Sequence, residues 1–151
     1  MVTVYAILGE SNTRKSSSVR ALTGVARFKE VTVTTNVGDI NVFVRISALQ
    51  ESEIDPQEFI AEVTSGKYAN VLVPLRIFQL ITGNRTYPDG STYIQDFIRA
   101  GWHIHHVVVL GIPTLQNPLP GGTPKPNYIP LSASTPVNKI ASQIRNWWDW
   151  V

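Results

Sequence analysis

The order of apolar and polar residues along the chain separates strand-like runs from helix-like stripes. Apolar runs at 2–8 and 71–75, and the second half of 103–110, predict strands buried on both faces of a parallel sheet. Two runs rich in β-forming residues, 31–35 and 40–46, are separated by four turn-type residues. This spacing predicts an antiparallel hairpin.

Apolar residues at helical spacing occupy the segments between these strands. Helices are predicted at 15–22, at 55–66 after an Asp-Pro start, at 91–101 and at 136–148. The resulting order, β-α-β-β-α-β-α-β-α, predicts a three-layer α/β domain whose sheet is mainly parallel with one antiparallel hairpin. Pro74, near the end of its strand, indicates either an edge strand or a point where pairing stops.

Composition narrows the class of protein. A chain of 151 residues with 43% hydrophobic and 16% charged residues predicts one globular domain over 1–151. The absence of cysteine excludes disulfides, thiolate metal sites and cysteine nucleophiles. A net charge of +2 does not argue for nucleic acid as a partner. No run resembles a membrane helix or a secretory signal, so a cytoplasmic setting without membrane contact is expected.

The most specific motif follows the first strand. Residues 9–17 read Gly-Glu-Ser-Asn-Thr-Arg-Lys-Ser-Ser, the layout of a phosphate-binding loop, G-x-x-x-x-G-K-[ST], with an arginine at the second glycine. In such a loop, backbone N–H groups and a helix N-terminus surround an anion, and the lysine adds a positive charge. The residues predicted to bind phosphate are Gly9, Asn12, Thr13, Arg14, Lys15, Ser16 and Ser17. The alternative is a serine-rich helix start that matches the motif by accident.

This loop resembles the G-x-S-N-x-G-K-S-S loop of the Era/EngB-type P-loop GTPases, which also carry a hairpin after the first helix. The resemblance implies a P-loop fold over roughly 2–112, with Lys15 on the β- and γ-phosphates and Ser16 on Mg²⁺. The family's D-x-x-G would correspond to 45–51, where the aspartate and the glycine are missing, and its N-K-x-D to 111–114, which reads Gly-Ile-Pro-Thr. The resemblance therefore implies no guanine specificity.

Hydrolysis by a phosphate-binding loop also needs a strand-end aspartate that helps to hold Mg²⁺. The ends of the third and fourth predicted strands carry Arg45 and Arg76 instead, and we predict no metal site. The nearest carboxylates that could replace the missing acid are Glu10, Glu51 and Glu53.

Positive residues thus stand where an acid is expected, and two interpretations are open. They could form a polyanion pocket that works without Mg²⁺, built from Arg14, Lys15, Arg45, Arg76 and Arg85. Like charges about 6 Å apart cost roughly 2–3 kcal/mol per pair at an effective dielectric of about 20, so such a cluster needs an anion. Alternatively, the arginines point to different faces and pair separately with Glu51, Glu53 or Asp55.

Three further features have structural and functional interpretations. His103, His105 and His106 begin a strand, which places His103 and His105 on one face and His106 on the other, and we interpret them as structural or surface residues. Trp147 and Trp150 could anchor a protein partner or a second copy, whereas Trp148 fits the core stripe of the last helix. The proline-rich segment 113–135, with its flanking Pro136, contains seven of the ten prolines and predicts an irregular tether, a lid or a ligand for another protein.

These observations lead to three functional hypotheses. The first is a degenerate P-loop protein that binds a nucleotide or another phosphorylated ligand with little or no hydrolysis, which favours a binding protein over an enzyme. The second is an interaction or assembly module that kept the fold and lost the ligand. The third is a weak nucleoside triphosphatase.

Overall fold

The computed structural model describes residues 1–111, 115 and 117–151. Its helices are α1 (Lys15–Thr23), α2 (Pro56–Gly66), α3 (Gly90–Arg99) and α4 (Val137–Trp148), with one 3₁₀ turn at Ser132–Ser134. Its strands are β1 (Thr3–Leu8), β2 (Lys29–Thr35), β3 (Gly38–Val44), β4 (Asn70–Leu75), β5 (Leu80–Thr82), β6 (Arg85–Tyr87), β7 (His103–Leu110) and β8 (Asn127–Ile129).

A six-stranded sheet in the order β2-β3-β4-β1-β7-β8 forms the centre of the molecule. All neighbouring strands are parallel except β2 and β3, which pair antiparallel as the predicted hairpin. β5 and β6 form a separate antiparallel pair. The mainly parallel α/β architecture is therefore confirmed, and β4 lies between β1 and β3.

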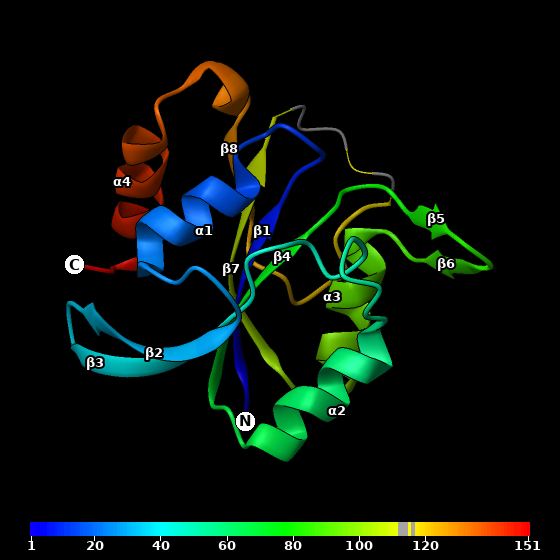
Figure 1. The fold of residues 1–151 in the computed structure, drawn as a ribbon. Helices are drawn as coiled ribbons and strands as arrows, with labels where there is room; N and C mark the ends of the chain where they lie inside the picture. Colours follow the sequence, from blue (N-terminus) through cyan, green and yellow to red (C-terminus); the bar gives the residue numbers. More distant parts are fainter. Residues whose placement is uncertain (112–114, 116) are drawn as a thin grey trace.

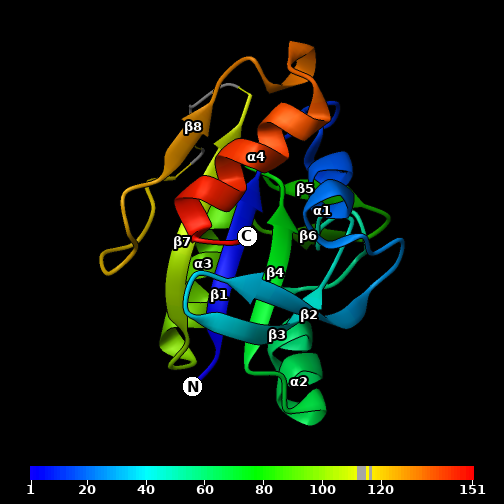
Figure 2. The ribbon, with the colours of Figure 1, turned by 90° about the vertical axis from the view of Figure 1, so that its left-hand side faces the viewer.

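Two helices cover each face of the sheet. α1 and α4 lie on one side and α2 and α3 on the other (Figure 1), and the view turned by 90° looks onto the side covered by α4 (Figure 2). Side chains of β1 alternate between the two cores: Val4, Ala6 and Leu8 pack toward α2 and α3, whereas Tyr5 and Ile7 pack toward α1 and α4. Burial on both faces explains why β1 is apolar at nearly every position.

Two predictions about strands are refined. Pro74 lies in the central β4, whose pairing with β3 ends at Leu72 while its pairing with β1 continues to Leu75. The alternative of interrupted pairing is therefore correct, and the edge-strand alternative is wrong. The proline-rich segment contains β8 and the 3₁₀ turn, so it is not wholly irregular. Residues 112–114 and 116, which include part of that segment and most of the N-K-x-D counterpart, lie outside the described residues.

The predicted arrangement of the β7 histidines holds in one part only: the rings of His103 and His105 contact each other, with centres 6.1 Å apart, but His106 lies beside His105 instead of opposite to it. The pairing register between β1 and β7 shifts after Val4, so that Thr3 faces His103 but Tyr5 faces His106. His105 is the extra residue of this irregularity, and its Nδ1 lies 2.6 Å from Nδ1 of His106. A bulge changes the direction of the following side chain, which period-two reasoning does not anticipate.

The C-terminus is part of the core. Trp150 is 5% exposed and Trp148 1% exposed, and both rings contact Tyr5. The backbone beyond α4 pairs with β2, where the N–H of Val151 donates to the carbonyl of Thr34 at 2.9 Å. The prediction for Trp148 is confirmed. The prediction that Trp150 is an exposed anchor is wrong, because the end of the chain turns back onto the hairpin and buries this side chain. Trp147 is partly buried against the same core.

No helix among the residues that the structure describes is long and apolar enough to cross a membrane.

Replacing Trp150 with alanine is expected to lower the free energy of unfolding by about 3 kcal/mol, because it leaves a cavity beside Tyr5 and Trp148. Urea denaturation measures this change. Val37→Ala, at a hairpin position that is 97% exposed, is the control and should change stability by less than about 0.5 kcal/mol. A Trp150→Ala variant as stable as the control would contradict the role assigned to the C-terminus.

Candidate functional site

The motif loop lies where the chain changes sides of the sheet. β1 leads through residues 9–14 into α1 on one face, and the adjacent β4 leads through 76–89 into α3 on the other. In parallel α/β sheets, ligands bind at such a switch point, beyond the carboxyl ends of the strands. The motif found in the sequence therefore lies at the position where this architecture favours a binding site.

The loop closes on itself through short contacts. The hydroxyl of Thr13 donates to the carbonyl of Glu10 at 2.7 Å, and a Cβ on Gly9 would lie 2.5 Å from that hydroxyl. Asn12 and Arg14 have left-handed backbone angles, with φ of 65° and 68°. Gly9 is therefore required for a close approach, and Arg14 holds the conformation that glycine favours at this motif position.

Hydrogen-bond donors at the start of α1 are free within the described part of the chain. None of the backbone N–H groups from Asn12 to Ser17 has an acceptor there. The helix begins at Lys15 after a residue that makes no side-chain cap, and its first turn contains no acidic residue. Free N–H groups at a helix N-terminus attract negative charge.

Lys15 places a cation inside this loop. The residue is 5% exposed, and its Nζ lies 3.5 Å from the carbonyl oxygen of Glu10. Across the described residues, no carboxylate lies within salt-bridge distance of this ammonium group. Burial lowers the pKa of Lys15, and the charge of Arg76 lowers it further, while Glu51 and Glu10 oppose the shift.

A cavity of about 250 Å³ lies over these donors. Its lining contains Glu10, Ser11 and Glu51 and five of the residues predicted to bind phosphate: Asn12, Arg14, Lys15, Ser16 and Ser17. Gly9 and Thr13 do not line this cavity but support the loop, as their mutual contact shows.

The oxygen ligands near this cavity do not fit Mg²⁺. The hydroxyl of Ser16, which the GTPase resemblance assigns to the metal, donates to the carbonyl of Ile46 at 3.1 Å. Glu51 pairs with Arg76 instead of standing free. Nor do the described residues contain a group of three or more histidines and carboxylates able to hold a metal ion.

Arg76 lies beside the loop, as predicted, but its guanidinium forms ion pairs with two acids, Glu10 and Glu51. Its Nε lies 3.2 Å from Oε2 of Glu10, and its Nη1 lies 3.5 Å from Oε2 of Glu51 and 3.3 Å from Oγ of Ser11. The other oxygen of Glu10 accepts the backbone N–H of Phe78 at 3.2 Å. Arg76 therefore joins the loop to the segment after β4.

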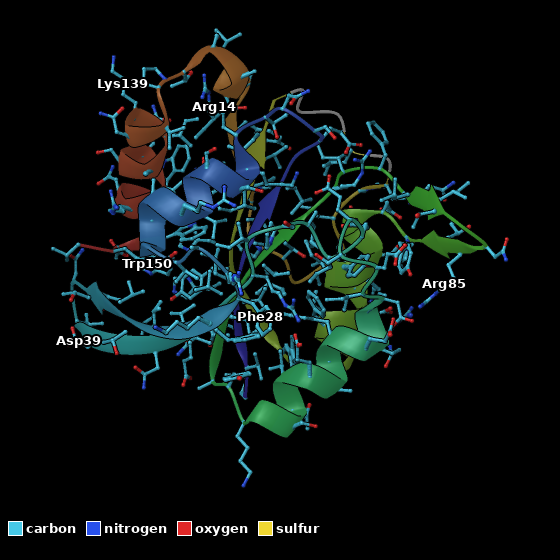
Figure 3. All side chains as sticks on the ribbon, in the orientation of Figure 1. Arg14, Phe28, Asp39, Arg85, Lys139 and Trp150 are labelled. Carbon is cyan, nitrogen blue, oxygen red and sulfur yellow. The ribbon has the colours of Figure 1, made fainter. Side chains whose placement is uncertain are left out.

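Arg45 and Arg85 do not face the loop, which corrects their place in a common cluster. The guanidinium of Arg45 pairs with both carboxylate oxygens of Glu62 on α2 and lies over the ring of Phe28, 4.5 Å from its centre. Arg85 pairs with the acids at the start of α2, Asp55 and Glu58, at 3.0 and 2.9 Å. Figure 3 shows Arg85 on the side of the molecule away from Arg14. Arg45, Arg76 and Arg85 therefore pair separately, although their partners differ in part from those expected, whereas Arg14 has no ion pair among the described residues.

Sequence reasoning missed Gln50 and Phe78. Gln50 is fully buried, and its amide donates to the carbonyls of Arg76 and Pro88 while accepting the N–H of Arg76 at 3.0 Å. The only signal for it was its position in the stretch 45–51, which would correspond to the D-x-x-G of the GTPases. Phe78 belongs to no recognisable sequence motif. It lies near the loop because its backbone N–H donates to the carboxylate of Glu10.

Arg14→Gly is expected to raise the free energy of unfolding by about 0.5 kcal/mol, because relief of the left-handed strain exceeds the added entropy of the unfolded chain. Arg14→Ala is the matched control, since it removes the same charge but keeps the strain. Urea denaturation should therefore give a higher free energy of unfolding for Arg14→Gly than for Arg14→Ala. Equal free energies would contradict backbone strain at position 14.

Lys15→Met is expected to stabilise the protein at neutral pH, because it removes a buried charge. The native pKa of Lys15 is lowered, so as pH rises the native state loses this proton before the unfolded state does, and wild-type stability rises through that window. The gain in the free energy of unfolding from Lys15→Met is therefore largest below the native pKa of Lys15. It decreases as pH rises from that pKa to the pKa of a solvated lysine. Urea denaturation of both proteins from pH 7 to 10 measures this; an advantage that grows with pH would contradict the lowered pKa.

Comparison of the chain with models of known families, with curated proteins and with solved structures finds no match. The assignment of the site therefore rests on its own geometry, which is a lysine-containing loop with free N–H donors at the switch point of an α/β sheet.

Proposed function

We propose that this protein binds the phosphate groups of a nucleotide or another phosphorylated ligand on the loop from Gly9 to Ser17, with little or no hydrolysis. The observation that carries the proposal is Lys15, a 5% exposed cation that has a backbone carbonyl at 3.5 Å as its near neighbour. A buried charge is unfavourable unless it is paired and hydrogen-bonded. A bound phosphate supplies both the charge and the acceptors.

The neighbouring donors support an anion of phosphate size. N–H groups from Asn12 to Ser17 have no acceptor among the described residues, and all of these residues except Thr13 line the cavity that Lys15 lines. Its volume of about 250 Å³ suits a small polar group better than a whole drug-sized ligand. The left-handed Arg14 keeps the bend of the loop without glycine.

The surrounding acids support weak or absent hydrolysis. Phosphoryl transfer in P-loop enzymes depends on a hydroxyl and a strand-end aspartate that position Mg²⁺. Here the hydroxyl of Ser16 is committed to Ile46, β3 is followed by Arg45, and Glu51 is paired with Arg76. A binding protein, in which the ligand is held and not cleaved, fits these contacts better than a nucleoside triphosphatase.

The alternative of a ligand-free interaction module loses one of its arguments. It rests on Arg14, on the missing D-x-x-G and N-K-x-D motifs and on the tryptophan-rich C-terminus, and of these tryptophans Trp150 is buried against Tyr5 and Trp148. Loss of phosphate binding together with a stable self-association would still favour that alternative.

Isothermal titration with pyrophosphate, ATP and GTP, each with and without Mg²⁺, tests the proposal. Wild type is expected to bind in both conditions, and Lys15→Met to bind at least about tenfold more weakly, because it loses a charge-assisted contact. Lys67→Met, at the exposed end of α2, is the control and should bind as wild type does.

Absence of binding by wild type, or an unchanged affinity in Lys15→Met, would refute the proposal. Phosphate release from ATP or GTP should be no faster with wild type than with Lys15→Met. A release that depends on Lys15 would instead support the weak triphosphatase.

A further inference from the structure

A second cavity lies on the other side of the motif loop. It has a volume of about 410 Å³ and shares Glu10, Ser11 and Asn12 with the cavity that contains Lys15. Its remaining walls come from the ends of β4 and β7 and from the segment after β8, and are mainly apolar: Ile77, Phe78, Leu110, Pro130 and Ala133. The two cavities therefore adjoin at Glu10, Ser11 and Asn12.

Phe78 is held at the mouth of this second cavity. Its ring is 42% exposed although the residue is large and apolar. Its backbone N–H donates to Oε1 of Glu10 at 3.2 Å, and the other oxygen of Glu10 lies 3.2 Å from Nε of Arg76. The backbone of Phe78 is therefore tied to the loop from Gly9 to Ser17 through Glu10.

The two cavities differ in chemistry. One offers Lys15 and backbone N–H groups, and the other offers an aromatic ring, aliphatic walls and a rim formed by the exposed Ser11 and Asn12. An anionic group next to a flat ring with polar edges matches this pair, since bases stack on aromatic side chains and phosphates bind helix N-termini. A volume of about 410 Å³ is within the range of cavities that hold small organic ligands.

The geometry points to a nucleoside polyphosphate as the ligand, with its base in the cavity beside Phe78 and its phosphates on Lys15. This inference rests on the proposed function and adds the ligand class. Glu10, the carboxylate in the described lining, is already engaged by Arg76 and Phe78. It is therefore not free to read the edge of a base, and purine and pyrimidine nucleotides bind with affinities within about fivefold of each other.

Isothermal titration without Mg²⁺, using ATP, UTP and inorganic tripolyphosphate, tests the inference. Wild type should bind both nucleotides at least tenfold more tightly than tripolyphosphate. Phe78→Ala should weaken both nucleotides at least fivefold, because it removes the stacking surface, and tripolyphosphate less than twofold. Ala133→Leu, which adds a larger side chain to the cavity lining, should act in the same way. Ile81→Ala is the control, because Ile81 is an apolar residue of β5 that is 66% exposed and lies outside the cavity lining.

Equal affinities for ATP, UTP and tripolyphosphate would overturn the inference, and if that binding depends on Lys15 the proposed function stands. Equal loss of all three ligands in Phe78→Ala, with a normal unfolding curve, would also overturn it, because Phe78 would then support the loop instead of a base. Tighter binding of geranyl pyrophosphate than of ATP would also overturn the inference, because the cavity beside Phe78 would then prefer an aliphatic group to a base. Absence of binding by all of these ligands refutes both proposals.

Discussion

The carboxylate of Glu10 connects the two loops on which the candidate site depends. One oxygen lies 3.2 Å from Nε of Arg76, and the other accepts the N–H of Phe78 at 3.2 Å. The loop from Gly9 to Ser17 and the segment after β4 are therefore joined at the switch point of the sheet. The carbonyl of the same residue accepts from Thr13 and lies near Lys15, so side chain and backbone of Glu10 both shape the loop.

This arrangement also determines where positive charge remains. Arg45, Arg76 and Arg85 each pair with acids, and these pairs lie in different parts of the molecule. Lys15 has no such partner among the described residues, although it is the most enclosed of these cations. A site that leaves a buried charge unpaired sacrifices stability, and such a sacrifice is typical of binding sites.

Much of the fold could be predicted because its signals are local. The apolar β1, the hairpin and the helix starting at Asp55 and Pro56 each carry their own pattern, and the structure contains all three. The loop from Gly9 to Ser17 was also identifiable, since its spacing between a strand and a helix is specific. Predictions that needed the direction of a side chain were less successful: Arg45 turned to α2, His105 formed a bulge, and Trp150 entered the core.

The sequence by itself determined the four helices, the five longer strands and the place of the Gly9–Ser17 motif between a strand and a helix, because these depend on periodicity and on neighbouring residues. The short strands β5, β6 and β8 were not predicted. The tertiary structure alone decided which charges meet. Glu10 and Arg76 are separated by a helix, a hairpin and another helix, and adjacent pairing of β1 with β4 brings them together. The same pairing places Phe78 beside the loop and forms the second cavity, since contacts between distant segments depend on strand order and not on local pattern.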